Sequence, residues 1–583
     1  MLHTLTRSLR ENKGPALVTV LLSALEVVFE IVIPLFMSNL IDFGIEGGSM
    51  AAVWKFGAFL LLLAAFQLAT GVLAARIAAR ASVGFAANLR EDMYDNVQTF
   101  AFSNIDKFST ASIVTRLTTD TTNVQNAFQM LMRMAIRAPV MLIFSMIVSF
   151  RISRDISMTF LIILPILALA LFFIIRSVFP VFTRVFRTYD ELNNVVQENV
   201  RGIRVVKSFN QEQHEIGKFG AISARIYKDF SKGERLITLN APLMQFCIYT
   251  CMIVISWLGA KAIIASGNDP ALGLTTGNLT ALITYTMQIL SSLMMLSMVF
   301  AMLTISLSSA RRIAEVLEER SDIPQPEQPV MTVRDGAVDF DHVSFVYASK
   351  ADKKVLDDID LHIRSGETIG IIGGTGASKS SLVQLIPRLY DVTGGKLTLG
   401  GVDVRDYDLD TLRGAVAMVL QKNELFSGTI KENLRWGNEN ATDEELQHAC
   451  VLACADEFIS AMPDGYDTHI EQGGTNVSGG QKQRLCIARA LLKKPKVLIL
   501  DDSTSAVDTR TDAQIQQALS TYIPDTTKII IAQRISSVQN ADRIVVLDDG
   551  RIDAVGSHDE LLRTCEIYRE VYESQQKGGE DDA

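Results

Sequence analysis

The hydrophobic and polar residues of this chain follow different patterns in its two halves. The first half alternates long apolar runs with long polar ones, and six runs reach the roughly 20 residues that a helix needs to cross a bilayer. These predicted spans cover residues 16–41, 54–75, 134–150, 157–179, 237–264 and 277–306. From about Gly336 the pattern changes to short β-rich runs alternating with helices, which is typical of a parallel sheet covered by helices.

Two long polar stretches of the first half keep the helical period, so we expect the membrane helices to continue beyond the lipid. Residues 76–137 carry 7 lysines and arginines and residues 176–235 carry 11, whereas the other connections hold few. The positive-inside bias places both stretches, and both chain termini, in the cytoplasm. Arg151 and Arg154, in a short loop facing outward, run against this bias without outweighing it.

These patterns predict an α-helical membrane domain of six transmembrane helices with long cytoplasmic extensions, followed by an α/β domain with a helical subdomain. The predicted boundaries are 1–310 for the membrane domain, 311–335 for a linker, 336–572 for the α/β domain and 573–583 for an acidic tail. The first 320 residues carry a net charge of +6 and the rest −16, within a total of −10. The six cysteines show neither a disulfide framework nor a metal-ligand spacing.

A loop of small residues follows a predicted strand and opens a helix in the second half. In such a loop backbone N–H groups converge on phosphate oxygens, Lys379 supplies a positive charge and the hydroxyl of Ser380 can reach Mg²⁺. Ser378 occupies the position where glycine is usual, which would cost about 1 kcal/mol if its φ is positive. The residues of this phosphate loop are Gly373, Gly374, Thr375, Gly376, Ala377, Ser378, Lys379, Ser380 and Ser381.

Two further motifs belong to the same chemistry. An apolar strand ends in Asp501 and Asp502, and Asp501 is expected to emerge beside the phosphate loop, where a carboxylate can hold Mg²⁺. A second flexible loop precedes another helix, whose N-terminus favours an anion. This loop consists of Ser478, Gly479, Gly480 and Gln481.

With these motifs in this order, the soluble half resembles the nucleotide-binding domain of ABC transporters. The membrane half is similar to the exporter branch of that family, and the resemblance extends over nearly the whole chain. It implies ATP and Mg²⁺ as cofactors, a second half-transporter and the lipid bilayer as partners, and ATP-driven export of amphipathic drugs, lipids or peptides. It implies no nucleic-acid partner and a multi-pass location, expected in a bacterial inner membrane.

The resemblance also assigns roles outside these three motifs. Tyr347 matches the aromatic residue that stacks on adenine, although a core aromatic is the alternative, and Gln421 matches the glutamine that links Mg²⁺ to the membrane domain. Ser505 to Asp508 matches a loop that touches the opposite site. The segments around Asn104 to Thr115 and Arg204 to Glu212 match the coupling helices.

Three residues of the site depart from the family pattern: Ser378, described above, Asp502 and Gln533. Asp502 occupies the position of the glutamate that polarises the attacking water, and Gln533 that of the histidine that contacts the γ-phosphate. An aspartate is one methylene shorter, so its carboxylate is displaced by more than ~1 Å, which can cost about 100-fold in rate. Asp502, Gln533 and Gln421 are the candidate catalytic residues; Ser380, Gln421 and Asp501 are the candidate magnesium ligands.

These departures fall on the phosphate-loop side, whereas the Ser478–Gln481 signature is intact. ABC domains pair head to tail, so each ATP lies between the phosphate loop of one subunit and the signature of the other. The sequence therefore predicts a degenerate-site half of a heterodimeric exporter, resembling such subunits of bacterial multidrug exporters. A homodimer with slow hydrolysis, a lipid flippase and an ATP-gated channel or sensor stay open as alternatives.

Glu26 and Glu30 lie one helical turn apart within the first predicted span. A carboxylate in the hydrocarbon is costly unless it faces a cavity or a partner. We hypothesise that both line a substrate path that favours cationic cargo, with a polar contact between helices as the alternative. Met294 and Met298 form an adaptable stripe in the sixth span and are added to this path, with plain helix packing as the alternative.

Overall fold

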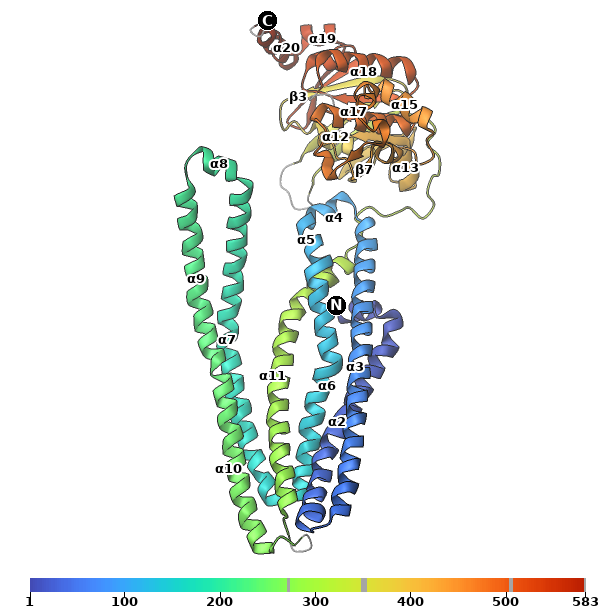
Figure 1. Cartoon of the computed structure of the whole chain (residues 1–583). Coiled ribbons are helices and arrows are strands. Elements are labelled where there is room, and N and C mark those ends of the chain that lie inside the picture. Colours follow the sequence, from blue (N-terminus) through green and yellow to red (C-terminus); the bar gives the residue numbers. More distant parts are fainter. Residues whose placement is uncertain (270–272, 348–353, 503–506, 581–583) are drawn as a thin grey trace. The chain divides into compact units, whose positions relative to one another are not determined.

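A computed structural model describes residues 1–269, 273–347, 354–502 and 507–580 of the chain (Figure 1). The chain divides into two compact units. The first comprises Met1–Gln98 and Thr110–Glu319, and the second comprises Thr99–Ser109 and the chain from Arg320 onward. A short segment from the helical half therefore belongs to the unit that carries the sheets.

The first unit is built from helices. Its helices are α1 (Leu2–Arg7), η1 (Arg10–Asn12), α2 (Lys13–Asn39), η2 (Leu40–Glu46), α3 (Met50–Gln98), α5 (Thr110–Thr115), η3 (Arg116–Asp120), α6 (Thr121–Ile152), α7 (Arg154–Arg201), α8 (Ile203–Ser208), α9 (Glu212–Thr238), α10 (Asn240–Ser266) and α11 (Thr276–Glu318). Among the described residues six helical segments are long and apolar enough to cross a membrane, which confirms the six predicted spans.

These helices extend well past the apolar runs, as the polar helical stretches predicted. Figure 1 shows α7 and α9 side by side along their length and joined through α8. Pro165 and Pro180 lie inside α7, where neighbouring helices can satisfy the backbone groups that proline leaves unpaired. The apolar faces of α7, α10 and α11 meet around buried residues such as Phe160, Ile255 and Ile289, which hold the three helices together.

The second unit contains α4 and a layered α/β domain. Its strands are β1 (Val338–Phe345), β2 (Leu356–Ile363), β3 (Thr368–Gly373), β4 (Gly394–Leu399), β5 (Val402–Asp403), β6 (Val416–Val419), β7 (Gly428–Thr429), β8 (His469–Ile470), β9 (Val497–Asp501), β10 (Thr527–Ile531), β11 (Arg543–Asp548) and β12 (Arg551–Gly556). Its helices are α4 (Phe102–Lys107), α12 (Lys379–Gln384), α13 (Leu409–Ala415), α14 (Ile430–Arg435), α15 (Asp443–Leu452), α16 (Asp456–Ser460), η4 (Gly465–Asp467), η5 (Gln472–Gly474), α17 (Gly479–Leu492), α18 (Thr509–Tyr522), η6 (Ile535–Ser537), α19 (His558–Thr564) and α20 (Glu566–Glu580).

The strands form a six-stranded sheet in the order β12-β11-β3-β10-β9-β6, an antiparallel sheet in the order β2-β1-β4-β5, and the pair β7-β8. In the larger sheet β11, β3, β10, β9 and β6 are parallel, and only β12 runs against its neighbour. One apolar cluster fills the space around both larger sheets, and a second joins the inserted helices α14, α15 and α17 to the sheet. The expected α/β core with a helical subdomain is therefore present.

Candidate nucleotide-binding site

Four neighbouring parallel strands bring the predicted ATP-site residues to one edge of the sheet. The phosphate loop follows β3, Gln533 follows β10, Asp501 ends β9, and Gln421 follows β6. Since β3, β10, β9 and β6 are adjacent in that order, their carboxyl ends lie side by side. This edge is where open parallel sheets bind their ligands.

The phosphate loop has the backbone that its small residues predict. Ser378 has a φ of 67°, so the serine adopts the left-handed conformation that was expected to be costly. The side-chain Nζ of Lys379 donates to the carbonyl oxygens of Gly373 (2.8 Å) and Gly374 (2.9 Å). At Gly374 and Gly376, apart from the adjoining residues, no heavy atom of the described part of the chain lies within 4 Å of the position a Cβ would take, which leaves room for a phosphate group.

Ser380 and Asp501, two of the three candidate magnesium ligands, lie within hydrogen-bond distance of each other. The hydroxyl of Ser380 donates to Oδ1 of Asp501 over 3.0 Å. Asp501 is only 3% exposed, and this burial raises the pKa of its carboxyl group. Burial also lowers the pKa of Lys379. The hydroxyl and carboxylate are the oxygen ligands that Mg²⁺ takes next to nucleotide phosphates, so the chain's residues fit Mg²⁺-ATP.

The three candidate catalytic residues meet at a single atom. Oδ2 of Asp502 accepts hydrogen bonds from Nε2 of Gln533 (2.7 Å) and Nε2 of Gln421 (3.3 Å). Asp502 is 8% exposed and has a φ of 49°, a left-handed conformation that aspartate tolerates better than most residues. Hydrogen bonds among Gln421, Asp502 and Gln533 therefore join the ends of β6, β9 and β10.

Tyr347 lies at the rim of this site and connects it to α4. The residue is 44% exposed, which excludes the alternative of a core aromatic, and its hydroxyl shares a 2.7 Å hydrogen bond with Ser381. The Tyr347 ring meets that of Tyr390 edge to face at 5.1 Å. Tyr390 in turn contacts the ring of Phe102 at 6.0 Å and donates a 2.8 Å hydrogen bond to Asp106. Phe102 and Asp106 both belong to α4, which overlaps the beginning of the first predicted coupling segment, around Asn104 to Thr115.

We expect Tyr390→Phe to loosen α4 from the sheet domain, because it removes the donor to Asp106 and keeps the ring. Partial burial and the Asp106 carboxylate raise the pKa of Tyr390, so the phenol stays a donor throughout the neutral range. A hydrogen bond to a charged group contributes about 1–2 kcal/mol when partly exposed. A double-mutant cycle of Tyr390→Phe with Asp106→Asn, measured as free energies of unfolding of the full chain, should give a coupling energy of that size. Strict additivity would contradict the contact.

The signature loop caps a different helix. Ser478 Oγ accepts from the N–H of Gln481 (3.3 Å), and Gln481 Oε1 accepts from the N–H of Ser478 (2.9 Å), a reciprocal cap that begins α17. Leu485 of α17 packs in the cluster of inserted helices, whereas Leu382 of α12 packs in the cluster around the sheets. The signature and the phosphate loop thus stand on separate parts of the unit. Of the predicted loop Ser505–Asp508, Ser505 and Ala506 lie outside the described residues; Asp508 caps α18.

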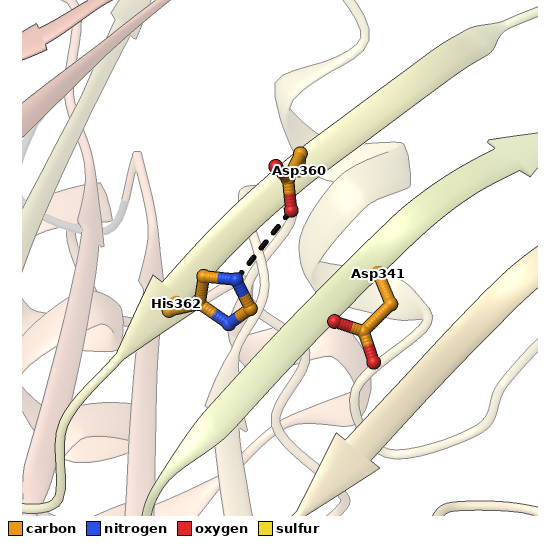
Figure 2. A group of neighbouring side chains, drawn as sticks. All are labelled: Asp341, Asp360 and His362. Carbon is orange, nitrogen blue, oxygen red and sulfur yellow. Dashed lines mark ion pairs between the residues drawn. The ribbon is translucent and has the colours of Figure 1, made fainter.

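A second polar cluster lies on the antiparallel sheet and was not predicted. Figure 2 shows Asp360 and His362 on one strand and Asp341 on the neighbouring one, and one ligand atom from each lies within 4.8 Å of the others. Both ring nitrogens of His362 face carboxylates, at 2.9 Å from Asp339 and 3.5 Å from Asp360. Two donors directed at two carboxylates suit a protonated imidazolium rather than a neutral metal ligand. The hydrogen bond to Asp339 accordingly raises the pKa of His362.

We expect the contribution of His362 to stability to decrease as the pH rises. A histidine pKa that folding raises stabilises the protein fully below the unfolded value of about 6.5, and this stabilisation is lost as the pH passes the folded pKa. Thermal unfolding of the full chain should therefore show a larger loss for His362→Gln at pH 5.5 than at pH 8.5. His214→Gln, in α9, controls for removing a histidine elsewhere, and equal losses for His362→Gln at both pH values would contradict the ion-pair assignment.

The two glutamates of α2 are paired with an arginine that sequence analysis did not single out. Arg137 of α6 donates Nη1 to Glu26 Oε1 (2.7 Å) and Nη2 to Glu30 Oε2 (2.6 Å). The alternative of a polar contact between helices therefore holds for both glutamates. Glu26 also lies against Gly71 of α3, where a Cβ would come within 3.2 Å of its carboxylate.

The two glutamates differ in their surroundings. Glu30 and Arg137 line a pocket of about 180 Å³ together with Gln288, Ser291, Met287 and Met295, and Glu26 is not part of this lining. Met294 and Met298 are not among the lining residues and are exposed, at 47% and 64%. The structure therefore separates the methionine pair from the pocket that Glu30 faces.

Family comparisons agree with this geometry. Residues 16–294 match the ABC transporter transmembrane region and residues 356–505 match the ABC transporter model. Over 558 residues the chain is 36% identical to the ABC transporter ATP-binding protein YfiB of Bacillus subtilis (strain 168), covering 96% of each. It is 33% identical to Rv1273c of Mycobacterium tuberculosis (strain H37Rv) over 580 residues, 99% of this chain and 98% of that one. The solved structure of a bacterial Atm1-family ABC exporter with ATP bound superposes with a TM-score of 0.80 at 24% identity, covering 97% and 98%.

The fold and the site thus define an exporter-type half-transporter, in which a membrane domain of six spans and an ATPase domain are fused in one chain. The chain belongs to the ABC transporter family. It is accordingly a multi-pass integral membrane protein that binds ATP and couples its hydrolysis to transport, and half-transporters of this kind act as dimers.

Proposed function

We propose that this chain is the degenerate-site half of a heterodimeric exporter. The observation that carries the proposal is the engagement of Asp502 Oδ2 by the amides of Gln533 and Gln421. A residue that polarises an attacking water must reach it with a carboxylate oxygen, and here one oxygen is occupied by two amide donors on a side chain that is already one methylene short. Gln533 is a neutral amide and cannot supply the protonatable ring of a histidine.

The division of labour follows from the head-to-tail pairing of ABC domains. This chain's phosphate loop would hold Mg²⁺-ATP through Lys379, Ser380 and Asp501 and release it slowly. The partner, with glutamate and histidine at the matching positions, would hydrolyse ATP against the signature Ser478–Gln481 of this chain. Nucleotide that stays bound at the degenerate site stabilises the closed dimer by mass action, so this site would keep the two ATPase domains associated between rounds of hydrolysis at the other site.

ATPase measurements of the purified chain, alone in lipid nanodiscs, test this proposal. We expect turnover at least about 100-fold below that of a competent exporter, because each site of a homodimer would carry the short carboxylate. Lys379→Ala is the control for contaminating ATPases. Brisk turnover that disappears in Lys379→Ala would overturn the heterodimer and favour a homodimeric exporter or flippase.

For the cargo, we propose amphipathic molecules with a cationic group, recognised at the pocket of Glu30. The cluster of Glu26, Glu30 and Arg137 holds two acidic groups against one basic group, a formal charge of −1, and a pocket lined by methionines accepts varied apolar groups. Because Glu30 faces the pocket and Glu26 does not, Glu30→Gln should weaken binding of a lipophilic cation such as tetraphenylphosphonium more than Glu26→Gln. Equal binding by wild type and both variants would remove this cargo class. Met294 and Met298 stay a prediction for a further part of the path.

We also propose a bacterial inner membrane as the location, with both termini in the cytoplasm. The orientation is supported by the charge of the helical extensions, with 11 lysines and arginines in residues 176–235 and 7 in residues 76–137, one of which, Arg137, pairs with the glutamates of α2 and does not count toward it. Cysteine labelling of the chain in sealed inverted vesicles distinguishes the two orientations.

A further inference from the structure

The segment that follows β10, residues 533–537, is held from two sides. On one side the Gln533 amide donates to Asp502 over 2.7 Å. On the other side a single residue of the C-terminal helix α20 contacts its backbone twice: Gln575 Nε2 donates to the carbonyl oxygen of Gln533 (2.7 Å), and Gln575 Oε1 accepts from the N–H of Ile535 (2.9 Å). We call residues 533–537 the switch segment.

The Gln575 amide suits this task chemically. It offers a donor and an acceptor on one rigid plane, so it can satisfy a carbonyl and an N–H two residues apart at the same time. The helix that carries it is anchored to the domain, since Tyr568 is fully buried and its hydroxyl lies 2.8 Å from Nδ1 of His558. A fixed helix can therefore fix the main chain of the switch segment.

A continuous set of contacts then runs from α20 to the ATP site. Gln575 holds the backbone of Gln533, the Gln533 side chain holds Asp502, and Asp502 follows directly on Asp501, which bonds Ser380 of the phosphate loop. If the switch segment shifts, the Gln533 amide leaves Oδ2 of Asp502. Because the neighbouring Asp501 bonds Ser380, and both are candidate magnesium ligands, a shift there would change how the phosphate loop holds Mg²⁺-ATP.

We propose that Gln575 is a positioning residue, which holds the switch segment against Asp502 and thereby prolongs the stay of nucleotide at this chain's phosphate loop. The inference rests on the proposed function, in which this site retains ATP. It goes beyond that function because it assigns a role at the ATP site to the C-terminal helix α20. The acidic composition of residues 573–583 does not predict such a role.

The experiment measures dissociation of a fluorescent, non-hydrolysable ATP analogue with Mg²⁺ from the full-length chain in nanodiscs. Gln575→Ala removes both hydrogen bonds and should speed release by about 2- to 10-fold, the range that corresponds to one net hydrogen bond. Gln575→Glu keeps the acceptor for Ile535 and places an oxygen against the carbonyl of Gln533, so it should release at least as fast. Gln576→Ala is the matched control, because its amide bonds Tyr572 on the same helix and should leave release unchanged.

Combining Gln575→Ala with Gln533→Ala shows whether Gln575 acts by positioning Gln533 or only by stabilising the fold. If Gln575 acts through Gln533, adding Gln575→Ala to Gln533→Ala should change release by less than about 2-fold. Two outcomes would overturn the inference: additive effects of the two substitutions, or equal release rates for wild type, Gln575→Ala and Gln575→Glu. If Gln575→Ala does not fold, the release rates of Gln575→Glu and Gln576→Ala are compared instead, and equal rates would overturn the inference. Because the analogue is not hydrolysed, this result is independent of turnover, whereas brisk ATP hydrolysis by the wild-type chain alone would overturn only the degenerate site.

Discussion

The double substitution Asp502→Glu with Gln533→His is expected to raise the ATPase activity of the isolated chain by about 10- to 100-fold. The added methylene moves the carboxylate toward the attacking water by about the 1 Å that Asp502 lacks, and a misplacement of that size costs about 100-fold. The histidine supplies a ring that can donate and accept at the γ-phosphate. Two copies of the variant would form complete sites, because the signature Ser478–Gln481 is already intact.

The single substitutions divide this gain. Asp502→Glu alone should give a partial increase, since the Gln533 amide that now bonds Oδ2 at 2.7 Å would still occupy the new carboxylate. Gln533→His alone should give little, because the short carboxylate remains. Steady-state ATPase assays in nanodiscs measure all three, with Lys379→Ala in the double variant as the control. A double variant as slow as the wild type would show that another feature of the site limits hydrolysis. Ser378, which has a φ of 67°, would then be the next residue to replace by glycine.

The ATP site was largely predictable because its motifs are local. Each motif is a short run of residues beside a strand, and the nucleotide requires them to meet, so Ser380 and Asp501 could be proposed as neighbours before the sheet order was known. Gln421 was proposed only from the resemblance to the ABC family. The order β3-β10-β9-β6 could not be predicted from these runs, because it depends on which strands pair across long stretches of sequence. The bond from Gln533 to Asp502 follows from that order, since it places β10 next to β9.

Contacts that depend on helix rotation were not predictable. Arg137 was counted among the cytoplasmic charges of residues 76–137, whereas in the structure it pairs with both glutamates of α2. Hydropathy places a residue along a span but not around the helix, so a charge near a span end gives no sign of its partner. The contacts of Gln575 were not predictable either. The sequence predicts an acidic tail for residues 573–583, whereas in the structure the helix α20 continues to Glu580.

Removal of the Arg137 charge is expected to give the largest loss of stability among these substitutions. The side chain of Arg137 is 26% exposed and those of Glu26 and Glu30 are 11% and 24% exposed, so Arg137→Gln leaves two carboxylates in a poorly solvated environment without a counter-charge. Breaking a buried ion pair from one side costs about 3–5 kcal/mol. Thermal unfolding in detergent should show this loss, and Arg133→Gln, one turn earlier in α6, should show much less.

The decisive comparison is the triple variant Glu26→Gln, Glu30→Gln, Arg137→Gln. The cost of desolvating the three charged groups offsets much of their mutual attraction. Removing all three charges together is therefore expected to lower the free energy of unfolding far less than removing Arg137 alone, even though the single variant keeps more of the native side chains. Recovery of most of the stability in the triple variant would establish that unpaired charge causes the loss. A triple variant as unstable as Arg137→Gln would instead mean that the guanidinium joins α2 to α6 by its shape and hydrogen bonds, which the two amides cannot replace.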